Sequence, residues 1–181
     1  MAHNMASAAK LTFVLGGARS GKSRYAESLV AGLPPPWQPP WTYVATAEAG
    51  DAEMAARIAT HRVRRGPQWR TVEAPRDLAA PLAARERTPM LVDCLTLWLS
   101  NLMLADADID AELARLEGAC GGPEAPLVLV ANEVGSGIVP DTTLGRRFRD
   151  WQGVLNQRIA ARADRVVLVV AGLPLMLKGT L

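Results

Sequence analysis

Hydrophobic runs alternate with amphipathic stretches along this chain, and the alternation predicts its secondary structure. Short, nearly unbroken apolar runs predict buried β-strands at residues 11–15, 41–45, 90–92, 127–131 and 165–170. Such runs are typical of parallel strands that are covered on both faces. Helical stretches lie between them, at residues 23–31, 51–65, 95–104, 109–119 and 143–162. The alternation predicts an α/β fold, with a mainly parallel sheet and helices on both faces.

A proline-rich segment, residues 34–40, interrupts this pattern between the first helix and the second strand. Proline lacks an N–H group and cannot continue a helix or an inner strand. We interpret the segment as a stiff surface connection, and a proline-rich ligand for another domain is the less favoured alternative. Residues 1–10 are small and polar, without the apolar core of a signal peptide, so we expect a disordered leader or an expression remnant. Residues 11–181 are expected to form a single domain.

Composition narrows the class of protein. Of the 181 residues, 49% are apolar and 21% are charged, which is typical of soluble globular proteins. No apolar run reaches the roughly 18 residues that a membrane span needs. The net charge of +2 is too small to indicate nucleic-acid binding. The two cysteines, Cys94 and Cys120, do not make a disulfide framework, so we expect a reduced, cytoplasmic protein.

The strongest motif is a glycine-rich segment between the first strand and the first helix. It fits the Walker A pattern and consists of Gly16, Gly17, Ala18, Arg19, Ser20, Gly21, Lys22 and Ser23. A strand, a tight turn and a helix N-terminus bring backbone N–H groups and the positive end of a helix dipole to one point, which favours a phosphate. Lys22 is expected to reach the β- and γ-phosphates, and the Ser23 hydroxyl to hold Mg²⁺. Because the context matches on both sides, we favour this interpretation over a chance glycine turn and predict a P-loop NTPase-like, RecA-like fold.

Two acidic residues follow buried strands and are candidates for the same site. Asp93 comes directly after the apolar run 90–92, which is the Walker B position for a Mg²⁺ ligand. Asp93 also suits the N-cap of the next helix, and we favour the Mg²⁺ role. Glu133 follows the run 127–131 and its adjoining asparagine. Glu133 suits two roles: it positions a substrate hydroxyl or a Mg²⁺-bound water, or it caps the glycine-rich turn 135–137. The sequence does not decide between these two roles.

His61 is the single histidine beyond the N-terminal segment. Met54, Ile58 and His61 share a helical face, so a core-edge histidine bonded to the backbone is the simpler interpretation. Arg57 and Arg65 stand four residues before and after His61, and nearby guanidinium groups disfavour a charged imidazole. A neutral imidazole is a nucleophile, and the same arginines would stabilise a phosphate under attack. A solvated basic helix end is the alternative for the arginines, so spacing alone leaves a catalytic His61 open.

Several segments together resemble one family, the bifunctional adenosylcobinamide kinase/adenosylcobinamide-phosphate guanylyltransferases of cobalamin biosynthesis. The resemblance runs from about residue 11 to residue 178. The Walker A motif is generic, whereas the segments at 132–140 and 148–160 are far more specific. The matching segments are GGARSGKS (16–23), YVATA (43–47), DAEMAARIATHRVRR (51–65), WRTVE (69–73), VDCLTLWLSNL (92–102), NEVGSGIVP (132–140) and RRFRDWQGVLNQRIAARADRVVLVVAG (146–172).

The resemblance implies two reactions on one nucleotide site. In the first, the aminopropanol hydroxyl of adenosylcobinamide takes a phosphoryl group from ATP or GTP. In the second, GTP gives GMP to the new phosphate through a GMP–histidine intermediate, and the matching histidine here is His61. The family pattern also implies a homotrimer, while the Mg²⁺ site at Ser23 and Asp93 is the one expected from the Walker A and Walker B positions. Beyond the Walker loop, it assigns nucleotide contacts to Ala45, Thr46, Ala47, Arg62, Val63, Arg64, Arg65, Glu73 and Asp93.

The two reactions attack different phosphorus atoms of the nucleotide. A P-loop presents the γ-phosphate, whereas guanylyl transfer needs attack at the α-phosphate. We therefore expect the helix at 51–65 to swing toward the P-loop when GTP binds. The competing interpretations are a small-molecule kinase without the guanylyl step and a regulatory P-loop ATPase that transfers nothing to a small molecule.

Overall fold

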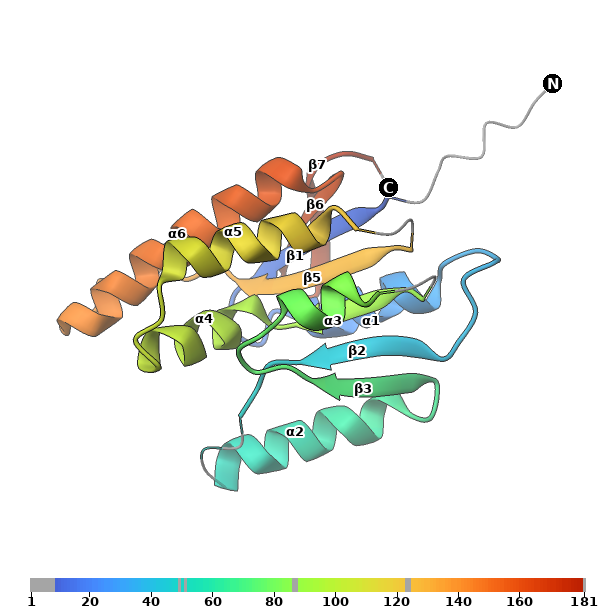
Figure 1. Cartoon of the computed structure of the whole chain (residues 1–181), viewed down its shortest axis with the longest axis horizontal. Coiled ribbons are helices and arrows are strands. Elements are labelled where there is room, and N and C mark those ends of the chain that lie inside the picture. Colours follow the sequence, from blue (N-terminus) through green and yellow to red (C-terminus); the bar gives the residue numbers. More distant parts are fainter. Residues whose placement is uncertain (1–8, 49, 51, 86–87, 123–124, 181) are drawn as a thin grey trace.

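A seven-stranded sheet, in the order β3-β2-β4-β5-β1-β6-β7, runs through the described part of the chain (Figure 1). The computed structural model describes residues 9–180 except 49, 51, 86–87 and 123–124, and it leaves the side chains of residues 53, 54, 57, 61 and 64 undescribed. Neighbouring strands are parallel except for β6 and β7, which form an antiparallel pair. The strands are β1 (Leu11–Gly16), β2 (Trp41–Ala45), β3 (Trp69–Glu73), β4 (Met90–Asp93), β5 (Leu127–Asn132), β6 (Arg165–Val170) and β7 (Leu173–Lys178).

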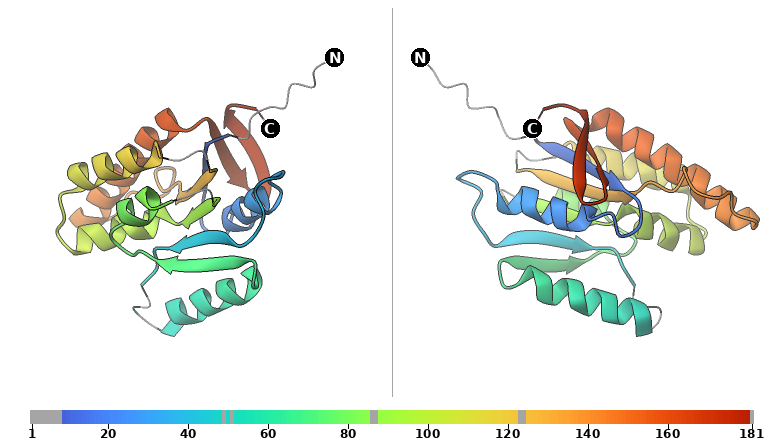
Figure 2. Two further views of the ribbon diagram at one scale, coloured as in Figure 1. Left: turned by 45° about the vertical axis from the view of Figure 1, so that its right-hand side comes forward. Right: turned by 180° about the vertical axis from the view of Figure 1, so that it is seen from behind.

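Helices cover both faces of this sheet, as the sequence predicts. The helices are α1 (Lys22–Ala31), α2 (Ala52–Arg65), α3 (Ala79–Ala83), α4 (Leu95–Leu104), α5 (Ile109–Cys120) and α6 (Thr143–Arg162). α1 packs through Ala26 and Val30 on one face, while α4, α5 and α6 pack a larger apolar layer on the other. α2 lies along the β3 edge of the sheet in every view (Figures 1 and 2).

The predicted strands and helices are confirmed, with shifts of at most one residue at their ends. The structure adds β3, α3 and β7, which the hydrophobic pattern did not predict. β3 has no fully buried residue, and β7 is mostly exposed and contains Pro174, as suits edge strands. Residues 34–40 lie in the connection between α1 and β2, as predicted. The expected leader, residues 1–10, lies outside the described residues apart from Ala9 and Lys10.

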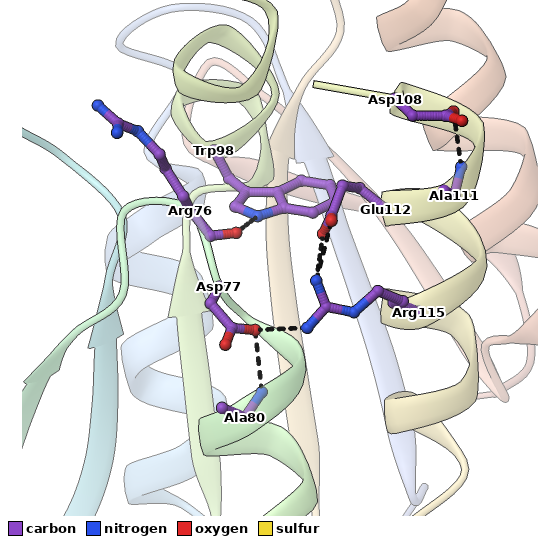
Figure 3. A network of polar contacts seen from close by, with 8 residues as sticks. All are labelled: Arg76, Asp77, Ala80, Trp98, Asp108, Ala111, Glu112 and Arg115. Carbon is purple, nitrogen blue, oxygen red and sulfur yellow. Dashed lines mark hydrogen bonds and ion pairs between the residues drawn. The ribbon is translucent and has the colours of Figure 1, made fainter. Parts of the chain in front are cut away.

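α4 holds the loops that follow β2 and β3. The Asn101 amide donates to the carbonyl oxygens of Thr46 at 2.8 Å and Pro75 at 2.9 Å. The Trp98 indole donates to the Arg76 carbonyl oxygen at 2.6 Å, and the indole is almost fully buried (Figure 3). Buried backbone carbonyl groups need such partners, so α4 fixes the path of both loops at the carboxyl edge of the sheet.

A surface network continues from the same loop to α5 (Figure 3). The Arg115 guanidinium bridges Asp77 at 3.2 Å and Glu112 at 2.9 Å. Asp77 also accepts from the Ala80 amide at the start of α3. Exposed pairs of this kind contribute little each, about 0–1 kcal/mol, so we assign the network an orienting role more than a stabilising one.

Candidate active site

The glycine-rich turn lies between β1 and α1, and its first glycine has no room for a side chain. A Cβ on Gly16 would come 2.6 Å from the carbonyl oxygen of Val169. Gly21 caps α1 at a φ of 94°, in the left-handed region that favours glycine. The Lys22 ammonium donates across the turn to the Gly17 carbonyl oxygen at 3.1 Å. The first turn of α1 carries no acidic residue, so its N-terminal amides form a favourable site for an anion.

The parallel strands end at one edge, which brings the predicted site residues together. Ala45 at the end of β2 is aligned with Glu73 on β3 and with Asp93 on β4. Gly16 is aligned with Asn132 in the same way. Because β5 lies between β1 and β4, Asn132 stands between the P-loop and Asp93. Ligands of open α/β sheets bind at this carboxyl edge.

A pocket of about 300 Å³ opens at this edge, which is the size of a small-ligand site. It gathers the P-loop, the ends of β2 and β4, α2 and the tip of β5. Lys22, Ser23 and Asp93, predicted for phosphate and Mg²⁺, thus share one cavity. The lining residues are Ala18, Arg19, Lys22, Ser23, Tyr43, Ala45, Ala47, Ile58, Arg65, Asp93, Cys94, Leu97 and Asn132.

α2 reaches this pocket through two described side chains, Ile58 and Arg65. His61 falls between them on the same helix, and its side chain lies outside the described residues, as do the side chains of Arg57 and Arg64. On an α-helix, positions 58, 61 and 65 share one face. Two described members of that face, Ile58 and Arg65, line the P-loop pocket.

Tyr43 joins Arg65 to Asp93 within the pocket. Its hydroxyl donates to Asp93 Oδ2 at 3.0 Å, and the Arg65 guanidinium carbon lies 3.5 Å from the centre of its ring. Burial and the adjacent Asp93 carboxylate hold the pKa of Tyr43 far above its usual value, so the phenol stays a donor.

Asp93 is not the N-cap of α4. That position belongs to Cys94, whose side chain makes no capping hydrogen bond, so the N-cap alternative for Asp93 is wrong.

Thr46 ties the end of β2 to the end of β4. It is fully buried, and its hydroxyl donates to the Cys94 carbonyl oxygen and accepts from the Cys94 amide, both at 2.8 Å. Ala45 and Ala47, on either side, line the pocket, whereas Thr46 does not. The structure therefore gives Thr46 a structural bond in place of a free hydroxyl for the predicted nucleotide contact.

The family follows from a comparison of the whole chain. The family model described as cobinamide kinase / cobinamide phosphate guanyltransferase, CobU, matches residues 12–177. This chain belongs to that family. The resemblance drawn from the sequence motifs is thereby confirmed.

Relatives cover nearly the full length of the chain. The bifunctional adenosylcobalamin biosynthesis protein CobP of Pseudomonas aeruginosa is 50% identical over 172 residues, covering 92% of this chain and 96% of the relative. The bifunctional adenosylcobalamin biosynthesis protein CobU of Salmonella typhimurium is 41% identical, covering 93% and 99%. The chain therefore corresponds to these bifunctional proteins over almost their whole length.

Solved structures bear out the fold. The flagellar accessory protein FlaH of Methanocaldococcus jannaschii aligns with a TM-score of 0.52 at 12% identity, over 94% of this chain and 79% of that one. An ATPase of a type III secretion system in pathogenic bacteria aligns with a TM-score of 0.52 at 12% identity, over 88% of this chain and 51% of that one. At this identity they show the fold alone, which confirms the predicted P-loop NTPase-like architecture.

Besides Thr46, four residues that the family pattern assigns to nucleotide binding lie outside the pocket or lack a described side chain. Arg62 and Val63 are exposed on α2, Val63 by 83%, and neither lines the pocket. Glu73 is exposed at the end of β3 and is not part of the lining. Arg64 has no described side chain. Contacts from Arg62, Val63 and Glu73 to a nucleotide would need a rearrangement of this edge.

Glu133 caps its turn. Both of its carboxylate oxygens accept from the Gly135 amide, at 2.8 and 2.9 Å. Its own amide donates to the Gly16 carbonyl oxygen at 3.2 Å, which ties this turn to the P-loop. Of the two roles left open by the sequence, the structure supports the turn cap.

Sequence reasoning missed several pocket residues, of which Tyr43 and Asn132 carry polar groups. Tyr43 lies two positions before Ala45 on β2, so the period of two places both on one face, and that signal was available. Asn132 is held at the tip of β5 by a bond from its amide to Thr96 Oγ1 and by one from Asn156 to its carbonyl oxygen. Its position beside Asp93 depends on strand order, which the sequence does not give.

The pocket suits a metal ion that takes only one or two ligands from the protein. Among the described residues, no group of three or more His, Cys, Asp and Glu side chains is placed to hold a metal ion. Mg²⁺ in nucleotide sites takes one or two protein oxygens and completes its shell with phosphates and water. Ser23 and Asp93 supply such a pair.

None of the described helices is both long and apolar enough to cross a membrane.

Proposed function

We propose that this chain phosphorylates adenosylcobinamide with ATP or GTP and then transfers GMP from GTP to adenosylcobinamide phosphate. The observation that carries the proposal is that a P-loop and two α2 side chains, Ile58 and Arg65, line one pocket. A plain kinase or regulatory ATPase needs the P-loop alone. Membership of the family supports the same pair of reactions.

The first step is an in-line phosphoryl transfer. The substrate hydroxyl oxygen attacks the γ-phosphorus, the bond to the β–γ bridging oxygen breaks, and the nucleoside diphosphate leaves while the hydroxyl proton passes to solvent. Catalysis here is mainly positioning and charge neutralisation. Lys22 and the α1 N-terminus supply positive charge at the phosphates. Mg²⁺ held by Ser23 and Asp93 would neutralise further charge on the transferred group.

The second step uses His61 as nucleophile. A neutral imidazole nitrogen attacks the α-phosphorus of GTP, and pyrophosphate leaves. A phosphate oxygen of adenosylcobinamide phosphate then attacks the same phosphorus, the P–N bond breaks, and adenosyl-GDP-cobinamide and free histidine result. Arg65, in the pocket, is placed to stabilise negative charge during both attacks. Arg62, which is exposed on α2, joins it only if α2 turns or moves when GTP binds.

Two expectations from the sequence belong to this proposal. The assembly is a homotrimer, which mass measurement in solution tests directly. The protein works in the cytoplasm, which agrees with two buried free cysteines, Cys94 and Cys120. Fractionation of the source cells tests that location.

The proposal is tested by following both products in one reaction. The protein is incubated with adenosylcobinamide, GTP and Mg²⁺, and the corrinoids are separated by chromatography and identified by mass spectrometry. Wild-type protein should yield adenosyl-GDP-cobinamide. His61→Ala should stop at adenosylcobinamide phosphate. Thr60→Ala, which removes only an exposed hydroxyl bonded to the Ala56 carbonyl oxygen, is the matched control and should behave as wild type.

The competing functions give different products. A kinase without the guanylyl step would accumulate adenosylcobinamide phosphate with both wild type and His61→Ala. A regulatory ATPase would hydrolyse the nucleotide and leave adenosylcobinamide unchanged. Either result would reject the proposal.

A further inference from the structure

Tyr43 lies between Asp93 and the α2 residue Arg65 in the pocket. It comes from the middle of β2 and is 4% exposed, yet it lines the cavity. Its hydroxyl end meets Asp93 and its ring face meets Arg65. One side chain therefore contacts the acid at the end of β4 and the last residue of α2.

The hydroxyl restrains Asp93. A hydrogen bond to a carboxylate is stronger than one between neutral groups, and here the donor sits on a buried ring. The ring is held by Trp69, whose centre lies 6.1 Å away with the planes at 89°. A donor fixed in this way limits the rotation of the Asp93 carboxylate in the pocket.

The ring restrains Arg65. A guanidinium group 3.5 Å above an aromatic ring makes a close cation–π contact, and partial burial strengthens it. Arg65 ends α2, and Ile58 is the other described α2 side chain in the pocket. The contact therefore anchors the C-terminal end of α2 beside the nucleotide site.

We propose that Tyr43 is a positioning residue for both reactions: its hydroxyl orients Asp93, and its ring anchors Arg65 and the α2 face that carries position 61. This inference rests on the proposed function. The two ends of the Tyr43 side chain serve different steps. Asp93 would hold Mg²⁺ for the phosphoryl transfer, whereas α2 carries His61, the proposed acceptor of GMP. Substitutions that remove one end at a time should therefore separate the two reactions.

Tyr43→Phe removes the hydroxyl and keeps the ring. The Mg²⁺ concentration for half-maximal kinase rate should rise about tenfold, the loss expected for a hydrogen bond to a charged group, and the rate should recover at saturating Mg²⁺. Mn²⁺ binding to the protein–GDP complex, measured by electron paramagnetic resonance, should weaken by a similar factor. Labelling of His61 from GTP should stay within about twofold of wild type.

Arg65→Gln and Tyr43→Leu test the contact between the Tyr43 ring and the Arg65 guanidinium group. Arg65→Gln keeps the Tyr43–Asp93 bond, so Mn²⁺ affinity should hold while His61 labelling falls about tenfold or more. Amide hydrogen exchange over residues 52–65 should speed up in both variants, since the anchor of α2 is lost. Arg70→Gln, an exposed arginine on β3 outside this pocket, is the matched control and should alter neither readout.

The outcomes separate this inference from the proposed function. Unchanged Mn²⁺ affinity in Tyr43→Phe, or wild-type exchange over α2 in Arg65→Gln, would overturn the positioning role. If Tyr43→Leu does not fold, Arg65→Gln carries the α2 arm alone. If the wild-type protein performs neither reaction, the proposed function fails, and the Mn²⁺ and exchange measurements still decide the role of Tyr43.

Discussion

The hydroxyl of Thr46 and the backbone of Cys94 form a reciprocal pair of hydrogen bonds, each 2.8 Å long, at the carboxyl edge of the sheet. Thr46→Val keeps the shape and leaves the buried Cys94 amide without this partner, while the Cys94 carbonyl oxygen still accepts from the Trp98 amide at 3.2 Å. The free energy of unfolding should fall by about 1–3 kcal/mol, the cost of one unsatisfied buried group. Urea unfolding measures the change. Thr46→Ser retains the hydroxyl and should lose much less; equal losses in the two variants would contradict this interpretation.

Glu133 should behave as a turn cap in kinetics as well as in structure. Glu133→Gln retains an acceptor for the Gly135 amide, so the kinase rate should stay within about threefold of wild type. Glu133→Ala should lower the unfolding free energy by about 1 kcal/mol, the usual contribution of one hydrogen bond. Rates and thermal unfolding are measured on the same preparations. A loss of activity in Glu133→Gln without a change in unfolding would mean that Glu133 takes part in the chemistry.

Lys22 should matter for both reactions, because both use the triphosphate gripped by the P-loop. Lys22→Ala should lower the kinase rate and His61 labelling by about 100-fold or more, as expected for a charge that acts on the transition state. Lys10→Ala removes an exposed lysine just ahead of β1 and serves as the control. An unchanged kinase rate in Lys22→Ala would overturn the Walker A assignment.

Much of this fold was predictable because its inner strands are continuous apolar runs. β1, β4 and β5 are buried on both faces, so their sequences differ plainly from the helices between them. β3 and β7 lie at the sheet edges, where partial exposure removes that signal. The P-loop was predictable because the motif is contiguous. The place of Asn132 in the pocket depends on strand order, which no local pattern records. Tyr43 could have been placed from the alternation along β2, and the turn cap by Glu133 was one of the two roles that the sequence left open.

The thiol of Cys120 predicts a pH dependence of stability. Burial raises its pKa from an ordinary value near 9 to about 11. The folded state therefore disfavours the thiolate. The contribution of the neutral Cys120 thiol to the free energy of unfolding is fully present below pH 9 and is lost as the pH rises toward 11. The unfolding free energy should fall by about 2–3 kcal/mol over this range, because a tenfold difference in proton affinity between the folded and unfolded states corresponds to about 1.4 kcal/mol. Unfolding by urea between pH 8 and pH 11 measures the loss, and Cys120→Ala should show a flatter curve. Equal slopes for the two proteins would contradict the buried-thiol assignment.

Delivery of GTP from the P-loop pocket to His61 is the step that separates this chain from a plain kinase, and it can be observed without any corrinoid. The protein is incubated with GTP labelled at the α-phosphorus and then denatured. We predict a protein-bound label that is labile to acid and stable to base, present in Thr60→Ala and absent in His61→Ala. Absence of label from the wild-type protein, or equal labelling of His61→Ala, would contradict the proposed guanylyl transfer.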